Sequence, residues 1–267
     1  MTLPPSPQKA KDVIARLAAS GRYHFTSEDI RRELGVSANA VKLTLNRQIH
    51  AGAIASPARG FYIIIPSEYQ QIRSLPPEQF VPALMVHWRL VYYVGLLSAA
   101  QYHGAAHQRP QAFQVFLPKA RPPIESGAVR VTFMARKKIR EVSKQNFNTP
   151  RGLVSVSTPE ATAIDLVGYE QRAGGLDQVA TVLAELADKI DPQRIVDAAR
   201  TAPLAWAQRL GYLLDELGHR PKARFLKDYV HDRARIAVAL APGEPTGGAH
   251  LSPEWKVLAN TQIEADL

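Results

Sequence analysis

Apolar residues in the first fifty positions recur at intervals of three and four, the spacing that predicts amphipathic helices. The first such segment covers residues 9–19 and keeps its apolar side chains on one face. The second begins at Thr26, a residue type that caps helices, and runs to Leu34. Gly35 then marks a tight turn before a third segment. We therefore expect three short helices at the start of the chain.

The third segment has two different faces. Ser37 is placed to cap it, and Val41, Leu45 and Ile49 recur every four residues and are expected to point inward. The opposite face presents polar side chains, and donors of this kind suit base edges and phosphates. These residues are Asn39, Lys42, Asn46 and Arg47. The third helix therefore predicts a surface that contacts nucleic acid.

Two strand-like runs follow, over residues 53–56 and 61–65, and a turn with Arg59 at its tip separates them. Three helices followed by such a hairpin predict a winged helix-turn-helix, whose third helix enters the DNA major groove. Ser37 is then expected on phosphate, and Arg59 on the backbone or in the minor groove. Arg22 and Arg31 are further candidates for phosphate contacts. Short three-helix domains also dock other proteins, and that alternative stays open here.

After the hairpin the pattern becomes a mixture of both element types. Helices are expected over residues 78–88, 92–104, 159–167, 176–188, 192–202, 204–217 and 224–230, and strands over 113–117, 128–135 and 153–156. The fold class is therefore α+β: an N-terminal winged helix-turn-helix, then a mixed α/β C-terminal domain with a helical subdomain. The expected parts are a DNA-binding domain over 1–75, an α+β domain over 76–170, its helical part over 171–241, and an extended tail over 242–267.

Charge is spread unevenly along the 267 residues, which carry 33 basic and 24 acidic side chains. Residues 1–74 hold ten basic and five acidic side chains, and residues 119–151 hold nine basic against two acidic. Residues 161–267 reverse the balance, with twelve basic against fifteen acidic. An excess of positive charge on the first half favours an anionic partner such as DNA.

A second basic patch lies outside the first domain. Its members are Arg136, Lys137, Lys138 and Arg140. This patch is a candidate for further contact with the DNA backbone, and a solvated loop with surface ion pairs is the alternative.

The composition of the chain excludes several kinds of site and of protein. The chain has no cysteine, which excludes disulfides, thiolate metal sites and cysteine nucleophiles. Neither a membrane span nor a basic-then-apolar leader is apparent, so we expect a cytoplasmic protein that does not enter a membrane.

Few residues point to catalysis, and we expect no enzyme, no cofactor and no metal. Glu160 and Asp165 would lie on different faces of one helix, where a capping role or a pair with an arginine such as Arg209 is expected. His103 and His107 are four residues apart, a spacing that suits zinc, but Gly104 between them ends the helix. A metal-dependent nuclease would need convergent carboxylates and a lysine, which the sequence does not place together.

Several blocks of the sequence resemble the AbiEi-type antitoxins. They are YYVGLLSAAQYHGAAHQRP from Tyr92, STPEATAIDLV from Ser157, GGLDQVATVLAEL from Gly174 and QRLG from Gln208. The resemblance covers nearly the whole chain to about residue 240. It implies a transcriptional autorepressor that binds the operator of its own operon through the winged helix. It further implies a C-terminal domain that counters a toxin with a nucleotidyltransferase-like fold, without a stable toxin complex.

Two other functions remain open at this stage. One is an interaction protein that sequesters a toxin directly, and the other is a solitary regulator without a cognate toxin. The chain is a monomer or a homodimer, and the sequence shows no dimer seam.

Overall fold

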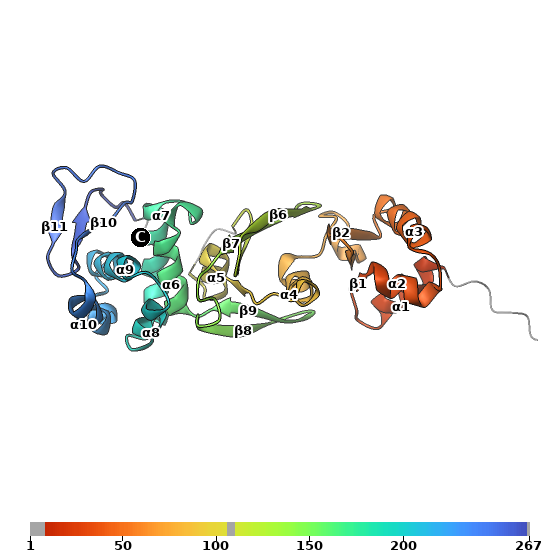
Figure 1. Cartoon of the computed structure of the whole chain (residues 1–267), viewed down its shortest axis with the longest axis horizontal. Helices are drawn as coiled ribbons and strands as arrows, with labels where there is room; N and C mark the ends of the chain where they lie inside the picture. The colour runs from red at the N-terminus through yellow and green to blue at the C-terminus, as the bar shows by residue number, and fades with distance from the viewer. Residues whose placement is uncertain (1–8, 106–109, 266–267) are drawn as a thin grey trace, which may run out of the picture. The chain divides into compact units, whose positions relative to one another are not determined.

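The computed structural model describes residues 9–105 and 110–265, in which helices and strands are mixed (Figure 1). Contacts divide the described residues into two compact units. Unit 1 comprises the described part of the chain up to Leu90, together with Arg121–Phe133 and Asn148–Val154, and unit 2 comprises the rest. The units interleave along the chain, whereas consecutive parts are expected from the sequence.

Unit 1 begins with three short helices, as the apolar spacing predicts. They are α1 (Ala10–Ala19), α2 (Ser27–Leu34) and α3 (Ala38–His50). Thr26 begins α2, because its hydroxyl accepts from the Asp29 N–H at 3.1 Å while the Asp29 carboxylate accepts from the Thr26 N–H at 2.9 Å. Gly35 ends α2 in the left-handed conformation, with φ of 62°. The turn between α2 and α3 thus follows from local sequence.

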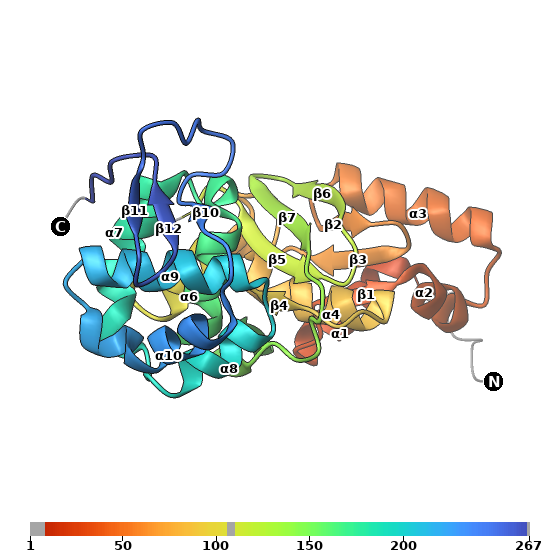
Figure 2. The ribbon, with the colours of Figure 1, turned by 60° about the vertical axis from the view of Figure 1, so that its left-hand side comes forward.

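A three-stranded antiparallel sheet accompanies these helices, and Figure 2 shows its hairpin beside α3. Its strands are β1 (His24–Thr26), β2 (Ile54–Ala58) and β3 (Phe61–Ile64), in the order β1-β3-β2. The Ser27 N–H donates to the Gly60 carbonyl at 3.1 Å, which holds the turn of the β2–β3 hairpin against the start of α2. Helices and sheet share one core that includes Val13, Phe25 and Ile30.

Unit 1 also contains a helix and a second hairpin. The helix is α4 (Pro77–Trp88), preceded by the 3₁₀ turn Ser67–Tyr69. The hairpin joins β6 (Arg121–Ser126) to β7 (Val129–Ala135), of which the last two residues belong to unit 2. The Trp88 ring packs against Phe133 and lies under the Arg121 guanidinium, which is 4.5 Å from the ring centroid. No strand is expected from the sequence over β6, which contains Pro122 and Pro123; prolines are tolerated in a strand at the edge of a sheet, where fewer backbone hydrogen bonds are formed.

Strands in unit 2 follow the order β5-β4-β9-β8. They are β4 (Tyr93–Val94), β5 (Phe113–Leu117), β8 (Lys144–Thr149) and β9 (Gly152–Ser157). The last two residues of β8 and the first three of β9 belong to unit 1. The expected helix over 92–104 is wrong at its start, because Tyr93 and Val94 pair antiparallel with β5 and Val94 pairs parallel with β9. Helix α5 is shorter and covers Leu96–Tyr102.

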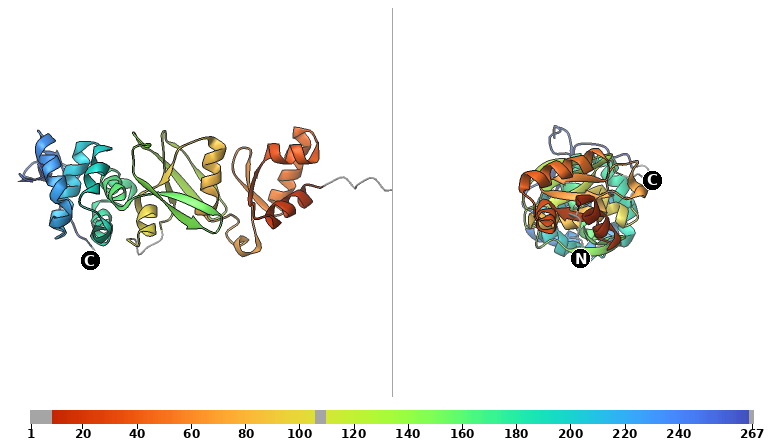
Figure 3. Two further views of the ribbon diagram at one scale, coloured as in Figure 1. Left: turned by 90° about the horizontal axis from the view of Figure 1, so that it is seen from below. Right: turned by 90° about the vertical axis from the view of Figure 1, so that its right-hand side faces the viewer.

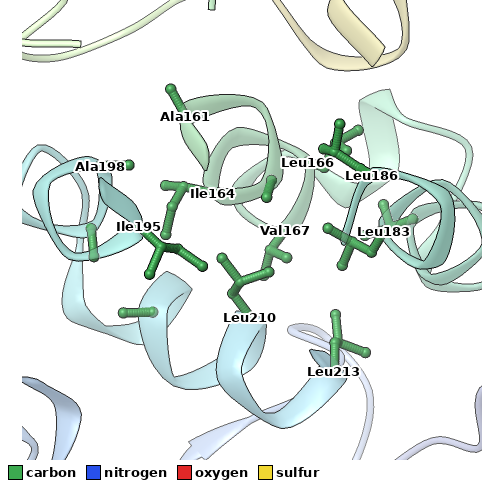
Figure 4. Close-up of a cluster of buried hydrophobic side chains, with 14 of the residues drawn as sticks. Ala161, Ile164, Leu166, Val167, Leu183, Leu186, Ile195, Ala198, Leu210 and Leu213 are labelled. Atoms are coloured by element: carbon green, nitrogen blue, oxygen red, sulfur yellow. The ribbon is translucent and has the colours of Figure 1, made fainter. Parts of the chain in front are cut away.

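Helices α7, α8 and α9 pack against α6, whose residues are almost all buried, and α10 packs against α8 and α9. The left view of Figure 3 shows these helices as one group. They are α6 (Pro159–Gly168), α7 (Leu176–Leu186), α8 (Arg194–Arg200), α9 (Leu204–Glu216) and α10 (Arg224–Arg233), with 3₁₀ turns at Glu170–Arg172, Ala187–Lys189 and Arg220–Ala223. Figure 4 shows Ile164 and Val167 of α6 facing Ile195 of α8 and Leu210 of α9. The nearly continuous apolar run of α6 is explained by this central position.

The end of the chain differs from the expected extended tail. Strands β10 (Val238–Ala239), β11 (His250–Ser252) and β12 (Val257–Ala259) form a small sheet in the order β10-β12-β11. Trp255, between β11 and β12, is 2% exposed and belongs to the core of unit 2. Burial of this large aromatic side chain holds the segment against the rest of unit 2. The glycine- and proline-rich composition around Trp255 is the reason why an extended tail is expected from the sequence.

Candidate nucleic-acid interface

Helix α3 presents the polar face that the sequence predicts. Asn39, Lys42, Asn46 and Arg47 are all exposed. None of these four side chains has a hydrogen-bond or ion-pair partner in the part of the chain that the structure describes. They are therefore available for contacts with another molecule.

The orientation of α3 follows from its apolar residues. Val41 and Leu45 are 2% and 0% exposed in the core of unit 1, so the opposite face of the helix points outward. The outward face includes two residues that the sequence analysis left out, Leu43 and His50. Their helical spacing from Asn39 and Asn46 was the signal that places them there.

Ser37 has a structural role at the start of α3. Its hydroxyl accepts from the Ala40 N–H at 3.3 Å, as a helix cap does. The side chain is exposed, but its acceptor oxygen is occupied within the helix. Its hydroxyl hydrogen, rather than its oxygen, is what remains for a phosphate.

Arg59 stands at the turn between β2 and β3. The residue is exposed and has no polar partner within the described residues. Gly60 follows it with φ of 76°, a conformation that makes this tight turn possible. The Gly60 carbonyl is held by Ser27, so the position of Arg59 relative to α2 is fixed by the backbone.

Arg22 and Arg31 already bind acidic neighbours. An Arg22 N–H donates to the Asp29 carboxylate at 2.8 Å, and an Arg31 N–H donates to Glu28 at 2.9 Å. Partial burial would raise the pKa of Asp29, but hydrogen bonds from Thr26 and the Arg22 guanidinium lower it below its usual value. Asp29 is therefore ionised and binds Arg22. Because Arg22 and Arg31 are each paired with a carboxylate, they attract phosphate less strongly than the unpaired Lys42 and Arg47 do.

Arg136 does not belong to an exposed basic patch. Its side chain is 3% exposed, and its Nε donates to the Asp165 carboxylate at 2.8 Å. Its remaining N–H groups donate to the Thr201 carbonyl and hydroxyl, and its guanidinium lies 5.0 Å from the Trp206 ring centroid. A buried carboxylate such as that of Asp165 in α6 is costly without a cation beside it. The cation is Arg136. The expected partner, Arg209, instead donates to the Ala239 carbonyl.

The other members of that patch are at the surface of unit 2. Lys137, Lys138 and Arg140 are exposed. Lys138 lies 3.8 Å from the Glu141 carboxylate, whereas Lys137 and Arg140 have no side-chain partner among the described residues. The patch is therefore smaller than predicted and carries two unpaired cations.

The residues considered for catalysis have structural roles. Glu160 accepts from the Asp191 N–H at 3.0 Å. His103 is buried, with Nε2 at 2.8 Å from the Ser157 carbonyl and Nδ1 at 3.3 Å from the Gln145 amide nitrogen, while His107 lies outside the described residues. Within the described residues, no three His, Asp or Glu side chains converge in a way that would hold a metal. In the same part of the chain, no helix combines the length and apolarity needed to cross a bilayer.

Comparison with protein families assigns both halves of the sequence. Residues 12–65 match a model described as a transcriptional regulator, AbiEi antitoxin, and residues 93–216 match the AbiEi antitoxin C-terminal domain. The chain belongs to the AbiEi antitoxin family. This confirms the resemblance seen in the sequence, and it supports an antitoxin role together with a role in regulating transcription.

A solved structure supports the fold of this AbiEi antitoxin. The RV2827C protein from Mycobacterium tuberculosis matches with a TM-score of 0.70 and 17% identity, over 95% of this chain and 92% of that one. At this identity the likeness shows a common fold. An antigenic nucleotidyltransferase-like protein from Paracoccidioides brasiliensis aligns with a TM-score of only 0.35 and 10% identity, over 56% of this chain and 89% of that one. No curated protein matches the sequence.

Proposed function

We propose that this chain is a DNA-binding transcriptional repressor of its own operon and the antitoxin of a toxin–antitoxin pair. In this proposal unit 1 acts as a winged helix-turn-helix, with α3 in the major groove and the β2–β3 hairpin as the wing. The observation that carries it is the exposed face of α3, whose Asn39, Lys42, Asn46 and Arg47 have no partner within the described chain.

Electrostatics favour DNA over a protein as the ligand of this face. Residues 1–74 carry ten basic against five acidic side chains, and the unpaired Lys42, Arg47 and Arg59 lie on α3 and on the hairpin turn. Such cations attract phosphates and release counterions when they bind. Asn39 and Asn46 add the paired donor and acceptor that read base edges.

The antitoxin role is assigned to the C-terminal part. The family match over 93–216 lies mainly in unit 2, whose core is built around α6 and contains the buried Arg136–Asp165 pair. We propose that it counters a nucleotidyltransferase-like toxin in the cytoplasm without forming a stable complex and without catalysis of its own. The protein acts as a monomer on each half of an operator or as a homodimer.

The DNA-binding half is tested by a mobility shift of the purified protein on the DNA upstream of its own gene, across a series of salt concentrations. We expect a discrete shift that resists competitor DNA and weakens steeply as salt rises. Weak binding that is indifferent to sequence would overturn the operator assignment and favour docking of a protein on α3.

The antitoxin half is tested by co-expression with the neighbouring toxin gene. We expect the chain to restore growth, and we expect the two proteins to separate on a sizing column. Restored growth with co-elution would instead support direct sequestration of the toxin. A chain that binds its operator but never restores growth would be a solitary regulator.

A further inference from the structure

The exposed face of α3 contains one apolar residue among its polar ones. Leu43 is 61% exposed, in contrast to Val41 and Leu45 on either side of it, which are buried in the core of unit 1. The side chain therefore contributes almost nothing to the core of this unit. An exposed leucine at the middle of a helix face is a feature to be explained by what the face contacts.

The surroundings of Leu43 are hydrogen-bonding groups. Residues three and four positions apart on a helix are surface neighbours, which places Asn39, Asn46 and Arg47 around Leu43. None of the three has a polar partner within the described residues. Leu43 is thus a single apolar spot framed by free donors and acceptors.

This arrangement fits a base pair better than a protein surface. Protein docking uses contiguous apolar patches, and Leu43 is the sole large hydrophobic residue of α3 exposed in the structure as described. In the major groove, by contrast, thymine presents a C5-methyl group that binds apolar side chains, and adenine presents N6 and N7 to asparagine.

We infer that Leu43 reads thymine through its C5-methyl group, with Asn39 or Asn46 on an adjacent adenine, so that α3 selects A·T pairs beneath its centre. Leucine cannot hydrogen-bond, and placing it over guanine O6 or cytosine N4 would desolvate a polar atom without replacing its partner. The inference rests on the proposed function, because it requires α3 to enter the major groove. It adds a specificity-determining residue to that function.

The experiment uses the full chain and duplexes selected from a random pool. Each thymine of the selected sequence is replaced in turn by deoxyuridine, which removes only the C5-methyl group. We expect one position, or its symmetric pair, at which the replacement weakens binding about fourfold for each methyl lost. At that position the Leu43→Ala variant should bind thymine and uracil duplexes equally, while Leu43→Met should retain the preference.

Leu251→Ala is the matched control, since Leu251 is also exposed, at 45%, but lies on β11 in unit 2. It should keep the full sensitivity to uracil. A wild-type protein that selects a sequence yet ignores uracil at every position would overturn the inference and leave operator binding intact. A Leu43→Ala variant that stays uracil-sensitive would do the same. Failure to select any sequence would overturn the proposed DNA-binding function itself.

Discussion

The Arg136 guanidinium lies 2.8 Å from the Asp165 carboxylate, with side-chain exposures of 3% and 0%. The Tyr93 hydroxyl donates to the second carboxylate oxygen at 2.6 Å. Burial and the nearby carboxylate raise the pKa of Tyr93, which keeps its hydroxyl protonated as a donor. This cluster joins β4, the segment after β7 and α6, so it links strands and helices within unit 2.

Removing one partner of this pair should destabilise the protein strongly. We expect Arg136→Ala to lower the free energy of unfolding by about 3–5 kcal/mol, because the carboxylate of Asp165 is left buried without a counter-charge. Urea denaturation followed by circular dichroism measures the change. The control is Arg140→Ala, an exposed arginine nearby, which should change stability by less than about 0.5 kcal/mol. Equal effects of the two substitutions would show that the buried pair is absent in solution.

The exposed cations of α3 should account for much of the DNA affinity. We expect the double variant Lys42→Ala/Arg47→Ala to bind the upstream DNA at least tenfold more weakly. A tenfold loss of affinity corresponds to the loss of about one base or phosphate contact. The slope of log affinity against log salt should also fall by about two units if both residues touch phosphate. Mobility shifts across a salt series give both quantities.

The control for this variant removes the same charge elsewhere. Lys189→Ala/Arg194→Ala alters two exposed basic residues of unit 2 and should leave the salt slope unchanged. If both double variants weaken binding equally, net charge rather than α3 determines the affinity. Circular dichroism of both proteins checks that they are folded.

His103 should make the protein less stable in mild acid. Burial lowers the pKa of His103 from its ordinary value near 6.5, and its two ring nitrogens bind Ser157 and Gln145 as a neutral imidazole. Below about pH 6.5 the unfolded chain therefore binds a proton that the folded one does not, and stability falls as the pH decreases. Above this pH the residue adds no pH dependence.

The test compares urea midpoints between about pH 7.5 and pH 5.5. The loss of stability over this range should be smaller in His103→Gln than in the wild type. His24, whose pKa is also lowered by burial, will leave part of the slope in place. His231→Gln changes an 83% exposed side chain and should retain the wild-type slope. A His103→Gln slope as steep as wild type would contradict the assignment.

Gly211 should not tolerate a side chain. A Cβ atom at this position of α9 would lie 2.0 Å from the buried Trp255 ring, so Gly211→Ala must displace the ring. We expect a loss of about 1–3 kcal/mol in the free energy of unfolding, larger than the helix-forming gain of alanine. A Cβ atom at Gly247 would have no atom within 4 Å, so Gly247→Ala should leave the free energy of unfolding unchanged. Thermal unfolding of the two variants distinguishes them, and an unaffected Gly211→Ala would mean that Trp255 packs elsewhere.

Elements with local signals were predictable from the sequence. The helices of the first domain have their limits at Thr26, Gly35 and Ser37, which act on backbone groups within a few residues. The exposed face of α3 followed from the spacing of Val41 and Leu45. In these cases the determining interactions lie inside one turn or helix.

Elements that depend on distant partners were not predictable. Tyr93 and Val94 are a strand because they pair with Phe116 and Val156, and no local pattern distinguishes them from the helix that follows. Arg136 looked like a surface cation because Asp165, its partner, is 29 residues away. Leu43 is a different case, because its spacing from Asn39 and Asn46 places it on the outward face of α3, whereas its apolar character favours the core, and it is 61% exposed.

Trp255 shows that the core of unit 2 extends further along the chain than the family match does. The family match stops at residue 216, yet the core of unit 2 also takes in Leu226, Leu240 and Trp255. A fragment cut where the match ends would leave the apolar side of α9 open to water and prone to aggregate. The region that the family model matches is thus shorter than the region that builds the core of unit 2, so a nonsense mutation after α10 would remove core residues although it leaves the matched region intact.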